Sequence, residues 1–577
     1  MEATEGRVPR DDYHLHDLAN GSFGCNHPGS SPSCRSSSPQ CNRTLLTSFP
    51  QTLAESLNGS ACDAFWAGTS YLLASAVGQP LIASLSDLFG RQQLLLISLI
   101  FFSLGAALCA FSHDFVLFLA GRSVQGIGGG GIITMGQIIF SDIVPLRQRP
   151  KYFAIVLGAW AIGTILGPVI GGLFVQYLNW HWVFYLNLPF CLAGFVMIPL
   201  FVKLNAVSTS TFTFRIRRID WIGSVLFIGS TTSFLVGISW AGVQFSWLSY
   251  QTLTPIIVGV VGILTMTFWE NICAEPIIRL ALFNNISAIA AYYCAFAQGF
   301  ILFEALYYTP FYFQSIHHSA ALRSGIDIFP VVCLLLPGSI VVSILTTKLG
   351  SFRWAIWCGW ILTTLGCGLL MLLDEDTKTP VWAGIMAVFG VGNGMVLTSI
   401  SVGIQAISRT EDCARAASMY AFVRTLGMSV GVAVGSTTFQ NMMSSKLSDL
   451  GISTAIAKVS EAYISTLYEL APPDPLRAGV LGAYVHGFKA IYLVITCVAG
   501  SALIASCFIG KHSMDRELES EFVLGEIVVD VRKDETPSSQ GQGKRVPVAV
   551  ESDENVLAEA FMCRKKVVIE RVYRTGW

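Results

Sequence analysis

The sequence predicts an all-α membrane protein with many spans, and three observations lead to this. Of its 577 residues, 53% are hydrophobic and only 13% are charged, whereas soluble domains carry about 25% charged residues. Thirteen apolar runs follow one another along the chain, each close to the ~20 residues that a membrane-spanning helix needs. Lys and Arg collect in alternate loops, as the positive-inside rule requires of a multi-span protein.

The composition also argues against several classes of function. The net charge is −1, so no basic surface invites nucleic acid. The 15 cysteines are scattered without a Cys-x-x-Cys pair or other metal-ligand spacing. The nucleotide-binding pattern Gly-x-x-x-x-Gly-Lys-Ser/Thr is absent, and no nucleophile stands beside a base at a recognisable spacing. We therefore expect no enzyme, no cofactor and no metal.

The chain begins with a polar stretch. Residues 1–62 are expected to be a disordered Ser/Pro/Gly-rich tail that ends in a remnant of a first span at 44–62, which is only half apolar. This remnant is too short to cross about 30 Å of hydrocarbon. Asn42 and Asn58 lie in glycosylation sequons and are candidate sites if this end is external. The later spans are expected near 64–84, 94–112, 115–138, 152–178, 182–203, 221–241, 253–270, 286–309, 326–347, 354–373, 381–405, 418–440 and 487–510.

The spans group into regions. An N-terminal helical bundle is expected at 63–203, and a basic cytoplasmic loop with two inserted spans at 204–275. A C-terminal helical bundle follows at 276–510, with an external loop at 441–486 whose amphipathic spacing predicts a surface helix. The charged segment 511–577 is expected to be a cytoplasmic tail.

The glycines reveal an internal repeat. Six glycines of the first half recur in the second half at one constant offset, since 390 − 126 and 427 − 163 both equal 264. The pairs are Gly126 with Gly390, Gly128 with Gly392, Gly130 with Gly394, Gly163 with Gly427, Gly167 with Gly431, and Gly171 with Gly435. The sequence therefore predicts two six-helix bundles in parallel repeat, which is the plan of a rocking transporter with its substrate site between the halves.

The sequence GTILGPVIGG at 163–172 lies at the centre of this pattern. Gly163, Gly167 and Gly171 share one helix face, and we expect a second helix to approach this face closely. Gly172 closes the motif. Pro168 cannot donate its backbone hydrogen bond and should bend the helix. A moving seam and a static packing face both remain open as interpretations.

Four motifs are similar to those of the major facilitator superfamily. GTILGPVIGG resembles its antiporter motif. SLSDLFGRQ at 84–92 resembles its loop motif, and LAGRSVQGIGGGG at 119–131 resembles its fourth-span motif with an arginine in the membrane. NWHWVFYLNLPF at 179–190 resembles the sixth-span entry of the fourteen-span drug:proton antiporters. The resemblance implies the major facilitator fold with a degenerate first span, and fungal toxin or secondary-metabolite efflux pumps are the nearest look-alikes.

The loop motif carries a candidate gating latch of Asp87, Gly90 and Arg91. Asp87 can pair with Arg91, or with a basic residue of another span in one conformation only, and such a contact acts as a latch. The alternative is an ordinary helix cap beside a positive-inside arginine.

Three ionisable residues inside spans are candidates for proton coupling or for the central cavity. An arginine in the membrane is costly without partners, so Arg122 should face protein. The family resemblance implies that it tunes a network coupled to protons, and the alternative is that it only bonds carbonyls of the neighbouring spans. Glu304 could carry the proton, or could be solvated near the external end. Beside it, Tyr307, Tyr308 and Tyr312 could line a substrate path, but an interfacial aromatic belt is the preferred interpretation. Arg424 could face the cavity or snorkel to the interface.

These patterns together predict a proton-coupled exporter of amphipathic organic compounds, working as a monomer in the lipid bilayer. Its partners would be protons and a small-molecule substrate. The plasma membrane is the expected location, with a vacuolar or vesicle membrane as the alternative. Two other functions stay open, namely uptake of a compound such as a siderophore–iron complex, and a membrane sensor on a transporter scaffold.

Overall fold

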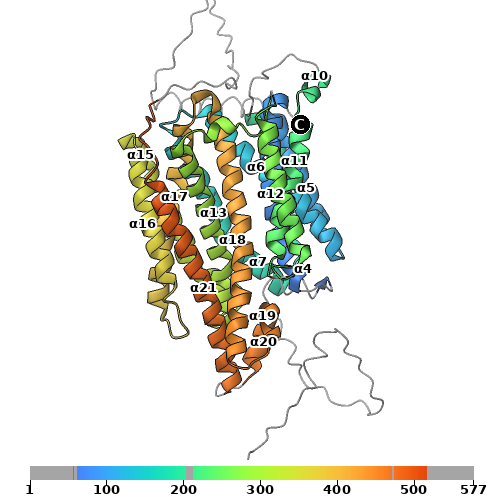
Figure 1. Cartoon of the computed structure of the whole chain (residues 1–577), viewed down its shortest axis with the longest axis vertical. Coiled ribbons are helices and arrows are strands. Elements are labelled where there is room, and N and C mark those ends of the chain that lie inside the picture. Colours follow the sequence, from blue (N-terminus) through green and yellow to red (C-terminus); the bar gives the residue numbers. More distant parts are fainter. Residues whose placement is uncertain are drawn as a thin grey trace, which may run out of the picture. The chain divides into compact units, whose positions relative to one another are not determined.

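The computed structural model describes residues 53, 56, 57, 61–202, 212–242, 244–273, 275–470 and 474–515. All of them fall in one compact unit. Within these residues the regular structure is helical and no strand is present (Figure 1). The expectation of an all-α protein is therefore confirmed. The glycosylation candidates Asn42 and Asn58, most of the first-span remnant and the tail beyond 515 lie outside the described residues.

Among the described residues, the first half contains five long helices and one short turn of helix. They are α4 (Ala61–Phe89), α5 (Arg91–Ala110), α6 (Phe115–Ile143), α7 (Arg149–Tyr177), the turn α8 (Trp182–Tyr185) and α9 (Asn187–Phe201). The next region holds α10 (Phe212–Arg217), α11 (Trp221–Trp240) and α12 (Tyr250–Glu270). The second half comprises α13 (Ile286–Ser315), α14 (Ala321–Asp327), α15 (Phe329–Leu349), α16 (Arg353–Leu370), α17 (Thr379–Ile407), α18 (Cys413–Asp449), α19 (Ala455–Lys458), α20 (Ser460–Glu469) and α21 (Pro475–Ser506).

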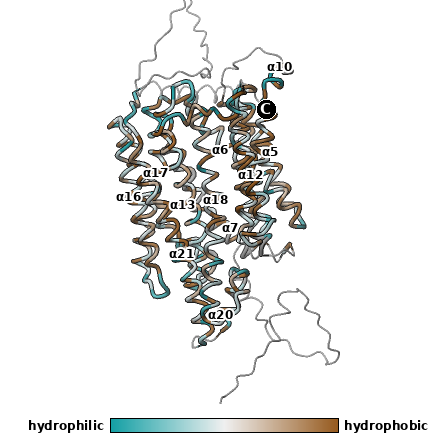
Figure 2. Tube along the Cα trace, viewed as in Figure 1, coloured by the Kyte–Doolittle hydropathy of each residue, from teal (hydrophilic) through white to brown (hydrophobic). Residues whose placement is uncertain are grey.

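The helices match the predicted spans. Eleven helical segments of the described residues are long and apolar enough to cross a membrane, and α7 and α16 are helical where the sequence predicts two further spans. Hydrophobic residues run along the helices and hydrophilic ones gather toward both ends (Figure 2). Large apolar side chains such as Leu192, Leu264 and Phe268 are exposed on the outer helices, as expected of a surface that faces lipid.

Local sequence explains where several helices begin. Asp114 caps α6 by accepting a hydrogen bond from the backbone N–H of Leu117 at 2.7 Å, and Asp220 caps α11 through Gly223 at 2.8 Å. Gly90 alone separates α4 from α5, with a φ of 101°. This left-handed backbone favours glycine because a side chain would strain it.

The two halves repeat the same helix contacts. Two glycines of α6 lie against carbonyl oxygens one turn apart on α4, and two glycines of α17 lie against carbonyl oxygens one turn apart on α15. The contacts are Gly126 with Tyr71, Gly130 with Ser75, Gly390 with Val331, and Gly394 with Leu335. The residue numbers of the paired glycines differ by 264. Those of the residues that carry the paired carbonyls differ by 260, as both 331 − 71 and 335 − 75 show. The repeat seen in the sequence is therefore also a repeat of packing.

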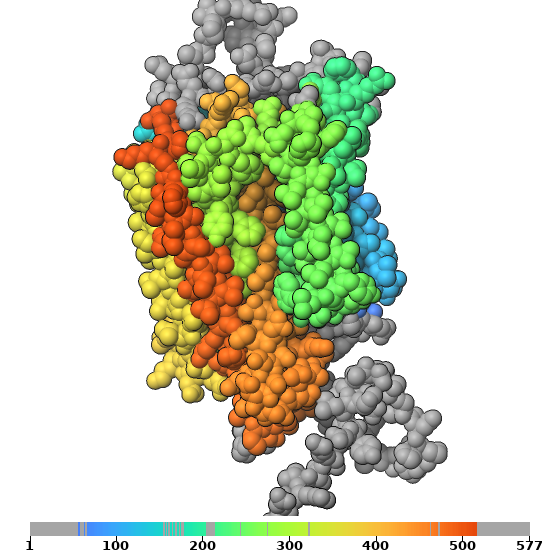
Figure 3. Space-filling view, viewed as in Figure 1, coloured from blue at the N-terminus to red at the C-terminus, as the bar shows by residue number. Residues whose placement is uncertain are grey.

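The inserted helices α11 and α12 attach to the bundle through α11, which packs against α4 and α18. The ring centroids of Phe227 on α11 and Phe422 on α18 lie 5.4 Å apart, and Thr437 on α18 donates a hydrogen bond to the Ala241 carbonyl at 2.7 Å. The surface is hollowed between α12 and α21, with α13 and α18 at the bottom of the hollow (Figure 3). The inserted pair thus leaves this face of α13 uncovered.

The segment 441–486, predicted as an external loop, is mostly helical. It holds the last turns of α18, the short helices α19 and α20, and the first turns of α21. α10 and α20 lie at opposite ends of the bundle (Figure 1). We call the end that carries Arg91, Arg147, Arg279 and Arg415 the basic end, and the other the α20 end.

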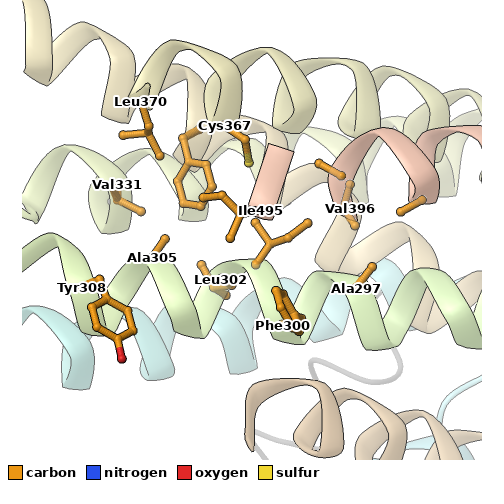
Figure 4. Packing of buried hydrophobic residues seen from close by; sticks show 14 of the residues in the cluster. Ala297, Phe300, Leu302, Ala305, Tyr308, Val331, Cys367, Leu370, Val396 and Ile495 are labelled. Atoms are coloured by element: carbon orange, nitrogen blue, oxygen red, sulfur yellow. The ribbon is translucent and has the colours of Figure 1, made fainter. Parts of the chain in front are cut away.

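Among the described residues, the largest hydrophobic core lies mostly in the second half and surrounds α13. Ala297, Phe300, Leu302 and Ala305 of α13 meet side chains of the neighbouring helices (Figure 4). A smaller core lies in the first half, where Leu53 and Leu57 of the first-span remnant are buried with Phe118 and Trp180.

Candidate functional site

The glycine face of α18 forms a tight seam with α13. A Cβ atom built on Gly431 would lie 2.6 Å from the Phe300 carbonyl oxygen, and one on Gly427 would collide with the Phe296 carbonyl. At Gly435 the nearest atoms belong to Tyr308 and Glu304. The close approach expected of a small-residue helix face is present here.

The matching face of α7 is different. Within the described residues, no atom lies within 4 Å of a Cβ built on Gly163, Gly167 or Gly171. The tight packing that the sequence predicts along this face is therefore not found in the described part. In the second half the covering helix is α13, and its counterpart by the repeat would be the first span, of which only Leu53, Ser56 and Leu57 are described. α7 runs through Pro168 and Gly172 and packs instead against α15.

The latch residues form a charged network at the basic end. Asp87 Oδ2 on α4 lies 3.1 Å from Arg415 Nε on α18, which ties the two halves together. Arg91 bonds the other oxygen of Asp87 and also pairs with Asp142 of α6, at 3.1 Å from Nε to Oδ2. Because Arg91 is only 4% exposed, this arginine holds Asp87 in position from inside the first half.

A second group at the basic end, around Arg149, was not singled out by the sequence analysis. Arg149 is buried and donates to Gln405 Oε1 of α17 at 2.6 Å and to the Ser141 carbonyl of α6 at 2.5 Å. Gln405 is the repeat equivalent of Ser141, because 405 − 264 is 141. The guanidinium thus bridges equivalent points of both halves, and the repeat offset was the signal that could have found it.

Arg122 lies in a neutral polar cluster toward the α20 end of the first half. Its Nε donates to the Ala67 carbonyl at 2.9 Å and one terminal nitrogen donates to Gln125 Oε1 at 2.8 Å. The guanidinium carbon lies 4.7 Å from the ring centroid of Tyr71, which adds a cation–π contact. The partners that an intramembrane arginine requires are thus two oxygens and an aromatic face, with no carboxylate among the described residues.

Glu304 lies in the seam between α13 and α18. Its side chain is 0% exposed, and neither carboxyl oxygen has a hydrogen-bond partner among the described residues. The interpretation that Glu304 is solvated near the membrane surface is therefore wrong. Tyr308 and Tyr312 are 3% and 1% exposed, so the expected interfacial belt is also wrong for these two. They are buried because they pack around Phe439 and Phe488.

Arg424 lies on α18 near the same seam. Its Nε donates to Gln298 Oε1 of α13 at 2.8 Å, and Gln298 is buried. The next residue, Thr425, accepts a hydrogen bond from Gln79 of α4 at 3.0 Å, which is a contact between the halves. Within the described residues, no hydrogen bond or ion pair joins Arg122, Glu304 and Arg424 to one another.

Similarity to known proteins agrees with this architecture. The sequence model of the Major Facilitator Superfamily matches residues 38–432. The chain is 41% identical over 474 residues to "MFS transporter L2" of Phoma sp., covering 82% of this chain and 79% of the relative. It is 34% identical over 490 residues to "Efflux pump FUS6" of Gibberella fujikuroi, covering 84% of this chain and 88% of the relative.

The fold has a counterpart among solved structures. The crystal structure of the human organic anion transporter MFSD10 (TETRAN) superposes with a TM-score of 0.50 at 14% identity, covering 79% of this chain and 88% of that one. At this identity the likeness concerns the fold alone. With the family match, the two close relatives and the repeated helical halves, the chain belongs to the major facilitator superfamily.

Proposed function

We propose that this protein exports amphipathic organic compounds, such as fungal toxins and other secondary metabolites, in exchange for protons. The observation that carries the proposal is the similarity, over 84% of the chain, to proteins named as efflux pumps in Gibberella fujikuroi and Fusarium sp.. Export to the medium requires the plasma membrane, with the basic end in the cytoplasm as the charge distribution predicts. A single chain, working as a monomer, holds both halves.

The halves would alternate between two arrangements, with the network at the basic end as the latch. The ion pair of Asp87 with Arg415 and the hydrogen bond of Arg149 with Gln405 both cross between the halves. Rocking of one half against the other would break these contacts and open the basic end, because each partner is carried on a different half. A contact made in one arrangement only shifts the balance between the two.

Glu304 would carry the proton. A buried carboxylate without partners is costly, so the carboxyl holds its proton in the arrangement described here and releases it when the seam opens. Arg122 and Arg424 would set the charge of the interior, since both bond only neutral partners among the described residues. An arginine keeps its own proton at any physiological pH, so neither is a carrier itself.

The proton gradient is sufficient for this work. One proton crossing 100 mV releases about 2.3 kcal/mol, and one pH unit adds about 1.4 kcal/mol. Their sum supports a substrate gradient of about 500-fold for each proton.

Expression in a yeast strain that lacks its own drug exporters tests this function. Cells are loaded with a panel of lipophilic fungal toxins, and retained toxin is measured by mass spectrometry. We expect lower retention of one or more toxins than in vector controls, and we expect a protonophore or Glu304→Gln to restore retention. Export that persists with the proton gradient collapsed would overturn proton coupling, and increased retention would overturn the direction.

A further inference from the structure

The helices α13 and α18 touch deep in the membrane at Gly299 and Arg424. A Cβ atom built on Gly299 would collide with the Arg424 carbonyl oxygen and would lie 3.2 Å from Arg424 Cγ. The backbone of Arg424 is therefore packed directly against α13, where glycine leaves room for the start of its side chain. Both residues lie roughly 16–20 Å from the basic ends of their helices, which is more than half of the ~30 Å hydrocarbon core.

The guanidinium of Arg424 lies beside the amide of Gln298 on α13. Arg424 Nε donates to Gln298 Oε1 at 2.8 Å, and because an arginine can only donate, this bond fixes which end of the amide faces it. The other end, Gln298 Nε2, has no hydrogen-bond partner among the described residues, although Gln298 is only 1% exposed. Within the same residues, the two terminal nitrogens of Arg424 likewise meet no acceptor.

Arg122, the other arginine far inside a span, is better satisfied. It donates two hydrogen bonds and lies over the Tyr71 ring, whereas Arg424 donates one in the described part of the chain. A guanidinium with so few partners is costly inside a membrane. A carboxylate suits it, because two parallel N–H···O bonds can form between the planar groups. The donors of Arg424 and Gln298 therefore match one carboxylate.

The surroundings of these donors join apolar surface to both halves. Thr425, the residue after Arg424, accepts a hydrogen bond from Gln79 of α4, which brings the first half to this level of α18. On the following turns Leu426 and Val430 are partly buried against apolar residues of α4 and α11. Polar donors with apolar neighbours suit an amphipathic molecule, and a position beside both halves suits alternating access.

We propose that Arg424 and Gln298 bind an acidic group of the cargo, so that the exported compounds are amphipathic organic acids with a carboxylate. Arg424 pairs with the carboxylate through its terminal nitrogens, and Gln298 Nε2 adds a further donor. The apolar body of the molecule lies against the neighbouring side chains. This inference rests on the proposed function and adds the substrate class to it.

The yeast export assay tests this class with matched pairs of compounds. Each pair is a lipophilic fungal carboxylic acid and its primary amide, which keeps the apolar body and removes the charge. We expect export of at least one acid and little export of its amide. Arg424→Gln should reduce acid export about tenfold or more, because charged hydrogen bonds are lost. Gln298→Glu should have the same effect, since its own carboxylate would pair with Arg424 in place of the cargo.

Binding to the full chain in lipid nanodiscs separates recognition from the later steps of transport. The probe is the exported acid, which should raise the thermal unfolding midpoint of the wild type, whereas its amide should not. This rise should disappear in Arg424→Gln and return in part in Arg424→Lys, which keeps the charge but loses the planar group. The control Arg409→Gln removes an exposed arginine at the basic end and should keep both acid export and the rise.

The possible outcomes keep this inference separate from the proposed function. Export of the amides as fast as the acids, or wild-type binding and export of an acid by Arg424→Gln, would overturn the substrate class and leave export itself in place. The comparison of acid with amide uses the unaltered protein, so it decides the question even where a variant fails to fold. Export of no compound at all would instead overturn the proposed function.

Discussion

Asp87 on α4 and Arg415 on α18 form an ion pair of 3.1 Å between the two halves of the molecule. Arg91 holds Asp87 from the first half, and Asp412 lies 3.5 Å from Arg415 in the second half. Each partner is thus oriented by its own half before it meets the other. This arrangement suits a contact that breaks and re-forms during transport, because neither charge loses all its partners when the halves separate.

The first prediction concerns this latch. Asp87→Asn removes the charge that joins the halves, so the basic end should open more often. A partly exposed ion pair contributes about 1 kcal/mol or less to stability. Its loss should therefore raise the population of the open arrangement by about fivefold at most. The native Cys413, which contacts Arg149 between the halves, reports the opening. In a chain whose other cysteines are replaced, its alkylation should become up to about fivefold faster.

Asp374→Asn is the matched control for the latch. Asp374 pairs with Lys489 at 3.0 Å, and both residues belong to the second half. Its loss should leave Cys413 alkylation at the wild-type rate. Unchanged alkylation in Asp87→Asn would mean that the pair does not hold the basic end closed.

The second prediction compares the two glycine seams. Gly431→Leu places a side chain against the Phe300 carbonyl, where even a Cβ would lie at 2.6 Å, so α13 and α18 must move apart. Overpacking of this kind costs about 1–3 kcal/mol. Gly167→Leu meets open space among the described residues and should be tolerated. Thermal unfolding in detergent should show a lower midpoint for Gly431→Leu only, and equal midpoints would contradict the described packing.

The repeat explains how much of the fold was accessible from the sequence. Apolar runs of membrane length locate the helices because lipid forces backbone groups to pair within each span. The constant offset of 264 then pairs α6 with α17 and α7 with α18. In the segment 441–486 the amphipathic spacing predicted a surface helix, but the continuation of α18 to Asp449 was missed, because this part of α18 is not apolar enough to extend the predicted span.

The candidate site was only partly accessible. A charge inside an apolar run drew attention to Arg122 and Glu304, because such residues are rare and costly in a membrane. The burial of Glu304 was not predictable, since it follows from packing against α18 and not from position along α13. The roles of Asp142 and Gln405 were missed because both look like ordinary residues at helix ends. Only the fold shows that they meet Arg91 and Arg149.

The third prediction concerns Arg122. Arg122→Lys keeps the charge but cannot bond the Ala67 carbonyl and Gln125 with one planar group. We expect toxin export in the yeast assay to fall about tenfold or more, because the loss of a charged hydrogen bond costs about 1.5–3 kcal/mol. The protein should still reach the membrane, which surface labelling checks. Arg218→Lys is the control, since Arg218 is an exposed partner of Glu275. Wild-type export by Arg122→Lys would leave this arginine with a packing role only.

The last prediction is a pH dependence of stability that follows from Glu461. Its pKa is raised by burial to about 7 in the folded protein, against about 4.3 in an unfolded chain. The folded state therefore binds this proton to higher pH than the unfolded state does. Stability from this group is fully present below about pH 4 and is lost as the pH rises through about 7.

Glu461→Gln isolates that dependence because a glutamine resembles the protonated acid at every pH. The difference in unfolding midpoint between Glu461→Gln and the wild type should be near zero at about pH 4 and should grow to at least about 2 °C in favour of the variant at about pH 8. Glu469→Gln, on the exposed side of α20, should show no such change with pH. A constant difference across this range would mean that the Glu461 carboxyl titrates in the folded protein as it does in water.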